Sequence, residues 1–128
     1  MSDAGEHPCI ARFVFDHGCI RADGTVRHGA FLEKRPPHNT SVNAHDIIRE
    51  DIHWKSGRKI NPTRQLVGAA DLESAAARSV GLAVVLDPTA DDPFHAELRN
   101  WPDDKAKRIE MARDLADASI FVPVPIGA

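Results

Sequence analysis

The side chains best able to do chemistry gather in the middle of the chain. Four of the seven histidines, His28, His38, His45 and His53, lie within residues 27–64. The same stretch holds eight lysines and arginines against four acidic residues, although the whole chain has a formal net charge of −3. Such a basic segment is typical of an anion-binding surface, but the same charges also pair within many folds. Residues 27–64 are therefore the first place to look for a functional site.

Three residues of this segment, His28, Arg35 and His38, are candidates for catalysis on phosphoesters. An imidazole exchanges a proton near neutral pH, and a guanidinium binds two phosphate oxygens at once. The triplet His38-Asn39-Thr40 resembles one H-x-[ST] element of the two-histidine phosphoesterases, in which two such elements face one phosphate. This chain contains a single element of that kind. A small phosphoester-acting enzyme is therefore one hypothesis for the function.

A second hypothesis is that the basic segment binds nucleic acid or a nucleotide. Guanidinium groups and loop hydroxyls suit phosphate oxygens, and an exposed indole can stack on a base. The candidate binding residues are Arg35, His38, Thr40, Trp54, Lys55, Arg58 and Lys59. The alternative is a solvated loop whose indole, at Trp54, folds back as an apolar lid, since tryptophans are usually highly buried.

The familiar catalytic and metal motifs are absent from the sequence. There is no G-x-G-x-x-G, no phosphate loop ending in G-K-[ST], no G-x-S-x-G, no H-E-x-x-H and no C-x-x-C. Cys9, His17, Cys19 and His28 offer soft ligands, but their spacing matches no standard zinc module. We therefore predict neither a metal site nor a cofactor.

The hydrophobic pattern predicts one α+β domain over residues 1–128, built on a small mixed or antiparallel sheet. The Asp23-Gly24 turn between two β-branched arms predicts an N-terminal hairpin. Strands are expected over residues 9–15, 40–43, 65–70, 82–86 and 120–122. Because residues 82–86 are apolar throughout, we expect them to form a central strand that is covered on both faces.

Two helices are expected in the C-terminal half. Asp71 is predicted to cap a short helix of about residues 71–80. The residues after Trp101 start a longer helix, about 102–118, with two carboxylates in its first turn and one apolar stripe. Shorter helical segments are expected over residues 45–52 and 94–98, and an exposed turn over 54–59 around a glycine.

No apolar run approaches the ~18 residues of a membrane span. The N-terminus also lacks the basic and apolar regions of a signal peptide. We therefore expect a cytoplasmic protein without membrane association.

Three segments, GLAVVLDP (81–88), PFHAEL (93–98) and WPDDKAK (101–107), give the chain a spacing that resembles uncharacterised small bacterial single-domain proteins. Those proteins are of the accessory or mobile-gene type found in integron cassettes. The resemblance implies an accessory role and brings no known activity or catalytic residues. Residues 65–128 are as a whole acidic, opposite in charge to residues 27–64, which favours docking or head-to-tail association. Our leading hypothesis is a non-catalytic binding protein whose partner is another protein or a second copy of itself.

Overall fold

The computed structural model describes residues 9–45, 51–90 and 92–125, and these form an antiparallel sheet with helices on both faces. The six strands follow the order β4-β5-β2-β1-β3-β6 across the sheet, and every adjacent pair is antiparallel. The strands are β1 (Cys9–Val14), β2 (Thr40–His45), β3 (Gly68–Glu73), β4 (Ala83–Leu86), β5 (His95–Arg99) and β6 (Ile120–Pro123). The helices are α1 (Asp51–Ile60), α2 (Ser74–Ser79) and α3 (Lys105–Ala118), with 3₁₀ turns η1 (His17–Cys19) and η2 (His28–Phe31). This architecture confirms the predicted α+β class.

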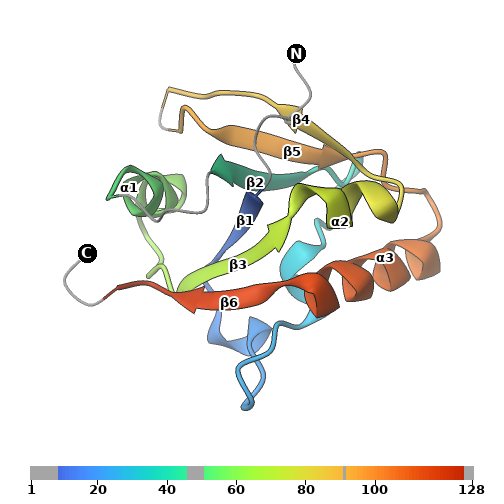
Figure 1. Ribbon diagram of the computed structural model, residues 1–128, viewed down its shortest axis with the longest axis horizontal. Helices are drawn as coiled ribbons and strands as arrows, with labels where there is room; N and C mark the ends of the chain where they lie inside the picture. The colour runs from blue at the N-terminus through green and yellow to red at the C-terminus, as the bar shows by residue number, and fades with distance from the viewer. Residues whose placement is uncertain (1–8, 46–50, 91, 126–128) are drawn as a thin grey trace.

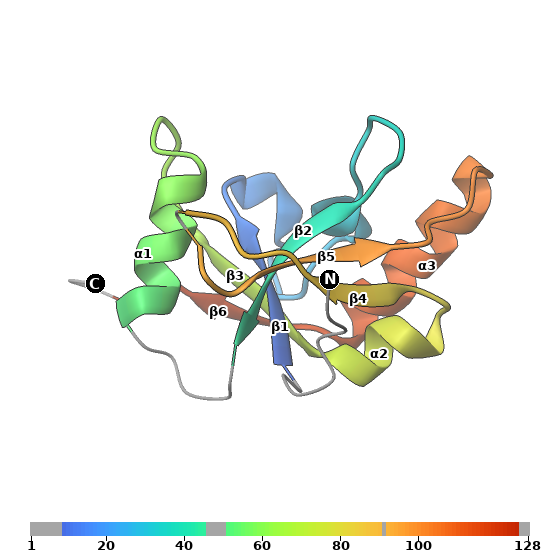
Figure 2. The same ribbon diagram turned by 90° about the horizontal axis from the view of Figure 1, so that it is seen from above.

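Helix α1 covers one face of the sheet, and α2 and α3 lie against the other (Figures 1 and 2). Side chains alternate along a strand, so the central strand β1 contributes to both layers. Ile10 and Val14 belong to the larger core, together with Leu115 of α3. Phe13 belongs to the smaller core, where it packs with Trp54 of α1.

The strand over residues 82–86 was predicted to be central, and this is wrong, because β4 forms one edge of the sheet. Val84 is nevertheless fully buried within the larger core, to which α2 also contributes Ala77. An apolar run therefore reports burial of the side chains. It does not report how many strands lie beside it.

The start of the helix predicted over residues 71–80 is wrong, because residues 71–73 pair with β1 as part of strand β3. Asp71 and Leu72 lie in β3, opposite Ala11 and Ile10, and helix α2 begins only at Ser74. Asp71 is therefore not the helix cap. The expected strand over residues 65–70 is correspondingly shifted towards the C-terminus.

Residues 94–98 were predicted to be helical, but residues 95–99 form strand β5, which pairs with both β2 and β4. Residues 54–59 were predicted to be a turn, but they lie within α1. Of the helix predicted over residues 45–52, residues 46–50 lie outside the described residues. The C-terminal helix is confirmed as α3, but it begins at Lys105, so the two carboxylates expected in its first turn precede the helix. Asp104 is instead its cap, with its carboxylate accepting from the Ala106 amide at 2.9 Å.

The predicted N-terminal hairpin is present as a turn closed by one isolated β-bridge. Ile20 pairs with Val26, and the Arg21 amide donates to the Thr25 carbonyl at 2.8 Å. The three-residue loop between them ends at Gly24, whose φ of +88° suits a residue without Cβ. Hydrogen bonds from the hydroxyl and amide of Thr25 lower the pKa of the Asp23 carboxyl.

Candidate functional site

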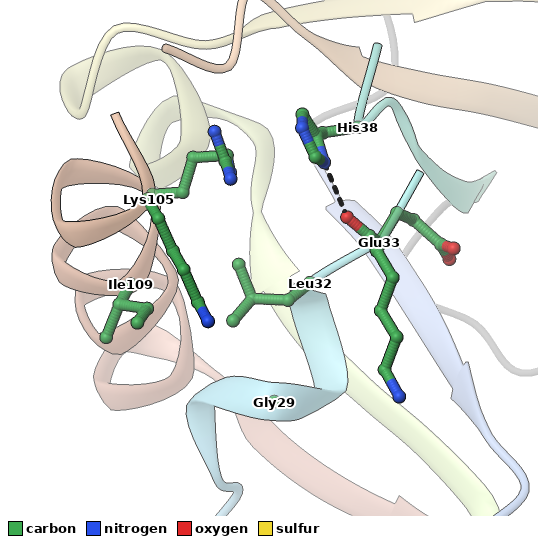
Figure 3. A pocket seen from close by; sticks show the side chains of 8 residues that line it. Gly29, Leu32, Glu33, His38, Lys105 and Ile109 are labelled. Atoms are coloured by element: carbon green, nitrogen blue, oxygen red, sulfur yellow. Dashed lines mark hydrogen bonds between the residues drawn. The ribbon is translucent and has the colours of Figure 1, made fainter. Parts of the chain in front are cut away.

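A cavity of about 450 Å³ lies between the η2–β2 connection and the first turns of α3 (Figure 3). Its lining combines apolar, cationic and imidazole side chains. The residues are Gly29, Leu32, Glu33, Lys34, His38, Lys105, Arg108 and Ile109. The volume lies within the range of about 300–1,000 Å³ that is usual for small-molecule sites.

Arg12 holds one wall of this cavity in place. Strands β1 and β2 are paired only as far as Ala11 and Asn43, and beyond that point the guanidinium of Arg12 spans the space between the two segments. It donates to the carbonyls of Ala30 and Ser41, both at 2.9 Å. It also pairs with the Glu33 carboxylate at 2.5 Å. The connection that carries Glu33 is therefore anchored to the sheet.

His38 is fixed at the end of the same connection. Its Nδ1 lies 2.7 Å from the carbonyl oxygen of Glu33, as Figure 3 shows. A carbonyl oxygen only accepts, so Nδ1 carries the proton and Nε2 stays available to a ligand. The backbone of His38 has a φ of +66°, an uncommon conformation for a residue with Cβ, and its amide donates to the carbonyl of Arg35 at 2.8 Å. The residue is thus held in one orientation.

Helix α3 supplies the opposite wall and two cations. Figure 3 shows the Lys105 side chain extending across the cavity towards Leu32. The guanidinium of Arg108 is held over the start of the helix by the carbonyls of Pro102, at 2.9 Å, and Asp103, at 2.5 Å. The N-terminal end of a helix adds further positive potential at the same place.

The charges around this cavity are unbalanced. Lys34, Lys105 and Arg108 each bring a positive charge, and none of them forms an ion pair within the part of the chain that is described. Glu33 is the single carboxylate among the described residues of the lining, and its charge is matched by Arg12. The arrangement favours an anion in the cavity.

The structure brings one of the three catalytic candidates to this cavity. His38 lines it, whereas His28 and Arg35 are not among the lining residues. Thr40, predicted to bind phosphate, is fully buried, and its hydroxyl donates to the Phe31 carbonyl at 2.8 Å. That hydroxyl is a structural hydrogen-bond donor, because it has no access to solvent.

The remaining binding candidates lie on α1, across the sheet from α3 (Figure 2). Trp54 is only 2% exposed and meets the ring of His53 edge-on at 4.8 Å, so an exposed indole that stacks on a base is not present. Lys55 and Lys59 are exposed, and Arg58 is half-buried. These cations are therefore separated from His38 by the sheet.

None of the three cations of the cavity was among the predicted binding residues. Lys34 lies within the basic segment of residues 27–64 but was not singled out there. Lys105 and Arg108 belong to the acidic C-terminal part of the chain, where the net charge conceals them. Their spacing of three residues, which puts both on one face of a helix, is the available signal. Nothing in the sequence pattern indicates that this face meets the η2–β2 connection.

A second cluster of polar side chains is buried on the α1 face of the sheet. Asn43 Nδ2 donates to both carboxylate oxygens of Asp92, at 2.9 and 3.1 Å, and the Phe94 amide donates to one of them at 2.9 Å. Asn43 Oδ1 lies 2.7 Å from Nδ1 of His53, which therefore donates to it. Asn43, His53 and Asp92 are at most 4% exposed. We assign this cluster a structural role, because solvent does not reach it.

Among the described residues, no group of three His, Cys, Asp or Glu side chains is placed to hold a metal ion. Cys9 and Cys19 are both free thiols, and burial raises the pKa of the Cys19 thiol. Within the same residues, no helix combines the length and hydrophobicity needed to cross a membrane.

Comparison with protein-family models, curated proteins and solved structures finds no match to this chain. The resemblance to accessory-gene proteins therefore stays a prediction.

Proposed function

We propose that this protein binds a small phosphate-bearing anion, of the size of a mononucleotide, in the cavity between the η2–β2 connection and α3. One observation carries the proposal. Lys34, Lys105 and Arg108 line one cavity, while the lining carboxylate, Glu33, is neutralised by Arg12. Ammonium and guanidinium groups are the usual protein partners of phosphate oxygens.

The rest of the lining supports a ligand with an apolar part. Leu32 and Ile109 offer apolar surface beside the cations, which is the composition usual for sites that hold a ring system and a charged group. His38 adds a nitrogen, Nε2, that can bind a phosphate oxygen when protonated. The described part of the lining contains a single imidazole, so we propose binding in this cavity and not two-histidine catalysis.

A compact ligand is favoured over a long duplex for a geometric reason. The basic side chains of α1 and those of the cavity lie on opposite sides of the sheet, so they do not form one continuous face. A duplex is bound mainly through many phosphates along one surface.

The test is isothermal titration calorimetry with pyrophosphate and with adenosine 5′-monophosphate at low salt. We expect both to bind, and the double variant Lys34→Ala/Lys105→Ala to weaken binding by about tenfold or more, since each hydrogen bond to a charged group contributes about 1.5–3 kcal/mol. The control is Lys55→Ala/Lys59→Ala, which removes the same charge from α1. Equal weakening by both pairs, or no binding of either probe at millimolar concentration, would show that the cavity is not an anion site.

A further inference from the structure

A second cavity, of about 320 Å³, adjoins the first. Glu33 lines both cavities, so they are neighbours separated by this residue. The second cavity lies between β1, β2 and the residues that follow α1. Its lining is Arg12, Phe13, Phe15, Glu33, Ser41, Val42, Ile60, Asn61 and Arg64. Figure 2 shows the C-terminal end of α1, the connection before β2 and the N-terminal end of α3 along the same rim of the molecule.

The second cavity has apolar walls that are left incompletely covered. Phe15 is half-buried, and Ile60 is 46% exposed, one of the few large apolar side chains in the described residues that solvent reaches to this extent. Both line the cavity. An aromatic ring and an aliphatic side chain on the walls of one cavity suit a flat aromatic ligand, because every base has a face that stacks on such rings.

Polar groups with unused hydrogen-bonding capacity accompany these walls. Arg64 is exposed, and its guanidinium is tied beside Phe15 by a hydrogen bond of 3.3 Å to the Phe15 carbonyl. Asn61 Oδ1 accepts from the Thr63 hydroxyl at 3.0 Å, and no partner of its Nδ2 group lies among the described residues, so Nδ2 can donate to a ligand. An amide and a guanidinium of this kind bind the acceptor atoms at the edge of a base or the phosphate next to it.

We propose that the ligand consists of two nucleoside units joined by a phosphodiester, with its terminal phosphate in the first cavity and its second base in the cavity of Phe15, Asn61 and Arg64. The inference rests on the proposed function, since the first cavity supplies the phosphate site. A free dinucleotide and the end of a single strand share this chemistry. Either would place the linking phosphodiester beside Glu33, whose charge is already matched by Arg12.

The experiment compares adenosine 5′-monophosphate, the 5′-phosphorylated diadenylate pApA and a 5′-phosphorylated hexaadenylate by calorimetry. We expect pApA to bind at least about tenfold tighter than the mononucleotide, because base stacking on an aromatic side chain contributes about 1–3 kcal/mol. Hexaadenylate that binds no tighter than pApA identifies a free dinucleotide as the ligand. Hexaadenylate that binds much tighter identifies a single strand. Both results support a second base site.

Two variants locate that site. Arg64→Ala and Phe15→Leu, the latter keeping an apolar side chain in place of the ring, are expected to lower pApA affinity towards that of the mononucleotide while leaving mononucleotide affinity unchanged. The matched control is Arg113→Ala, an exposed arginine of α3 outside both cavities. Thermal melts of each variant report whether the fold is intact. If Phe15→Leu unfolds the protein, the affinity of the Arg64→Ala variant alone tests the second site.

The results separate the two proposals. Mononucleotide binding with no gain for pApA, or a gain that neither variant reduces, overturns the second site and leaves the first intact. Loss of all binding in Lys34→Ala/Lys105→Ala, but not in Arg64→Ala, supports the first cavity as the phosphate site. If the mononucleotide and pApA both fail to bind the wild-type protein, the proposed function itself is wrong.

Discussion

Gly57 lies in the middle of α1, where the helix crosses the ring of Phe13. A Cβ at this position would stand 2.7 Å from that ring and 3.0 Å from Leu66. The absent side chain is what lets α1 approach the sheet this closely. The same glycine suggested a turn from the sequence, because glycine is a poor helix former and a common turn residue.

Gly57→Ala is expected to lower the free energy of unfolding by about 1–2 kcal/mol. Alanine favours a helix by about 1 kcal/mol over glycine, but forcing a methyl group into a packed core costs typically 1–3 kcal/mol, and a contact of 2.7 Å with a buried ring puts this site at the upper end. Urea denaturation measures the difference. The control is Gly29→Ala, where no heavy atom lies within 4 Å, and a change within about 0.5 kcal/mol is expected. A more stable Gly57→Ala protein would mean that α1 does not press on Phe13.

At the scale of elements, the Asn43 cluster joins three segments that are distant in sequence. Asn43 belongs to β2, His53 to α1 and Asp92 to the β4–β5 connection. The amide of Asn43 is the only group of the three that can both donate to a carboxylate and accept from an imidazole N–H. Asn43 is therefore the middle member of the hydrogen-bond series from His53 through Asn43 to Asp92, and this series holds α1 against the sheet.

Asn43→Leu is expected to lower the free energy of unfolding by about 3 kcal/mol, because it leaves the buried carboxylate of Asp92 without its side-chain donor. The double variant Asn43→Leu/Asp92→Asn is expected to recover part of that loss, since it removes the buried charge. Both are measured by urea denaturation. A double variant that is no more stable than Asn43→Leu would show that the charge of Asp92 is not what the cluster compensates.

At the scale of the whole molecule, the proposed phosphate site exists only when the chain is folded. Its cations come from Lys34 on one side and from Lys105 and Arg108 on the other, and the Arg12 hydrogen bonds position the intervening wall. A ligand held by both sides therefore binds the native state and not the unfolded chain. Such selective binding stabilises the whole fold.

Pyrophosphate at 100 times its dissociation constant is expected to stabilise the protein by about 2.7 kcal/mol. For a domain of this size that corresponds to an upward shift in Tm of roughly 8 °C. Differential scanning fluorimetry measures the shift across a concentration series. Lys34→Ala/Lys105→Ala should show little shift at the same concentrations. An equal shift in that variant would indicate a general salt effect and not occupancy of the cavity.

The two edges of the sheet bear on self-association, which stays a prediction. On β6, the Val124 amide donates to the Val67 carbonyl at 3.1 Å, so by strand alternation the backbone N–H and C=O groups at positions 121 and 123 point away from β3, at the free edge of the sheet. Position 123 is a proline and has no N–H to offer a further strand. At the other edge, the side chain of Val84 in β4 is fully buried, so β4 would meet a second copy through its backbone groups. The β6 edge is the poorer template of the two.

Local patterns predicted the parts of the fold that are determined by neighbouring residues. The α+β class, the strand at residues 9–15 and helix α3 follow from β-branched runs and a helical apolar stripe, which act within a few residues. Residues 54–59 were mispredicted because packing against Phe13 outweighs the local preference of a glycine for turns. Residues 94–98 were mispredicted because pairing of β5 with both β2 and β4 outweighs local helix preference.

The sequence by itself determined the fold class, the presence of α3 and its C-terminal end, and the basic character of residues 27–64, and it placed His38 among the candidates. Only the tertiary structure decided which cations face His38. It turned the basic residues of α1 to the opposite face of the sheet and brought Lys105 and Arg108 of the acidic part of the chain to the cavity. The physical reason is that a site of this kind depends on contacts between segments about 70 residues apart, and no local propensity encodes which faces of those segments meet.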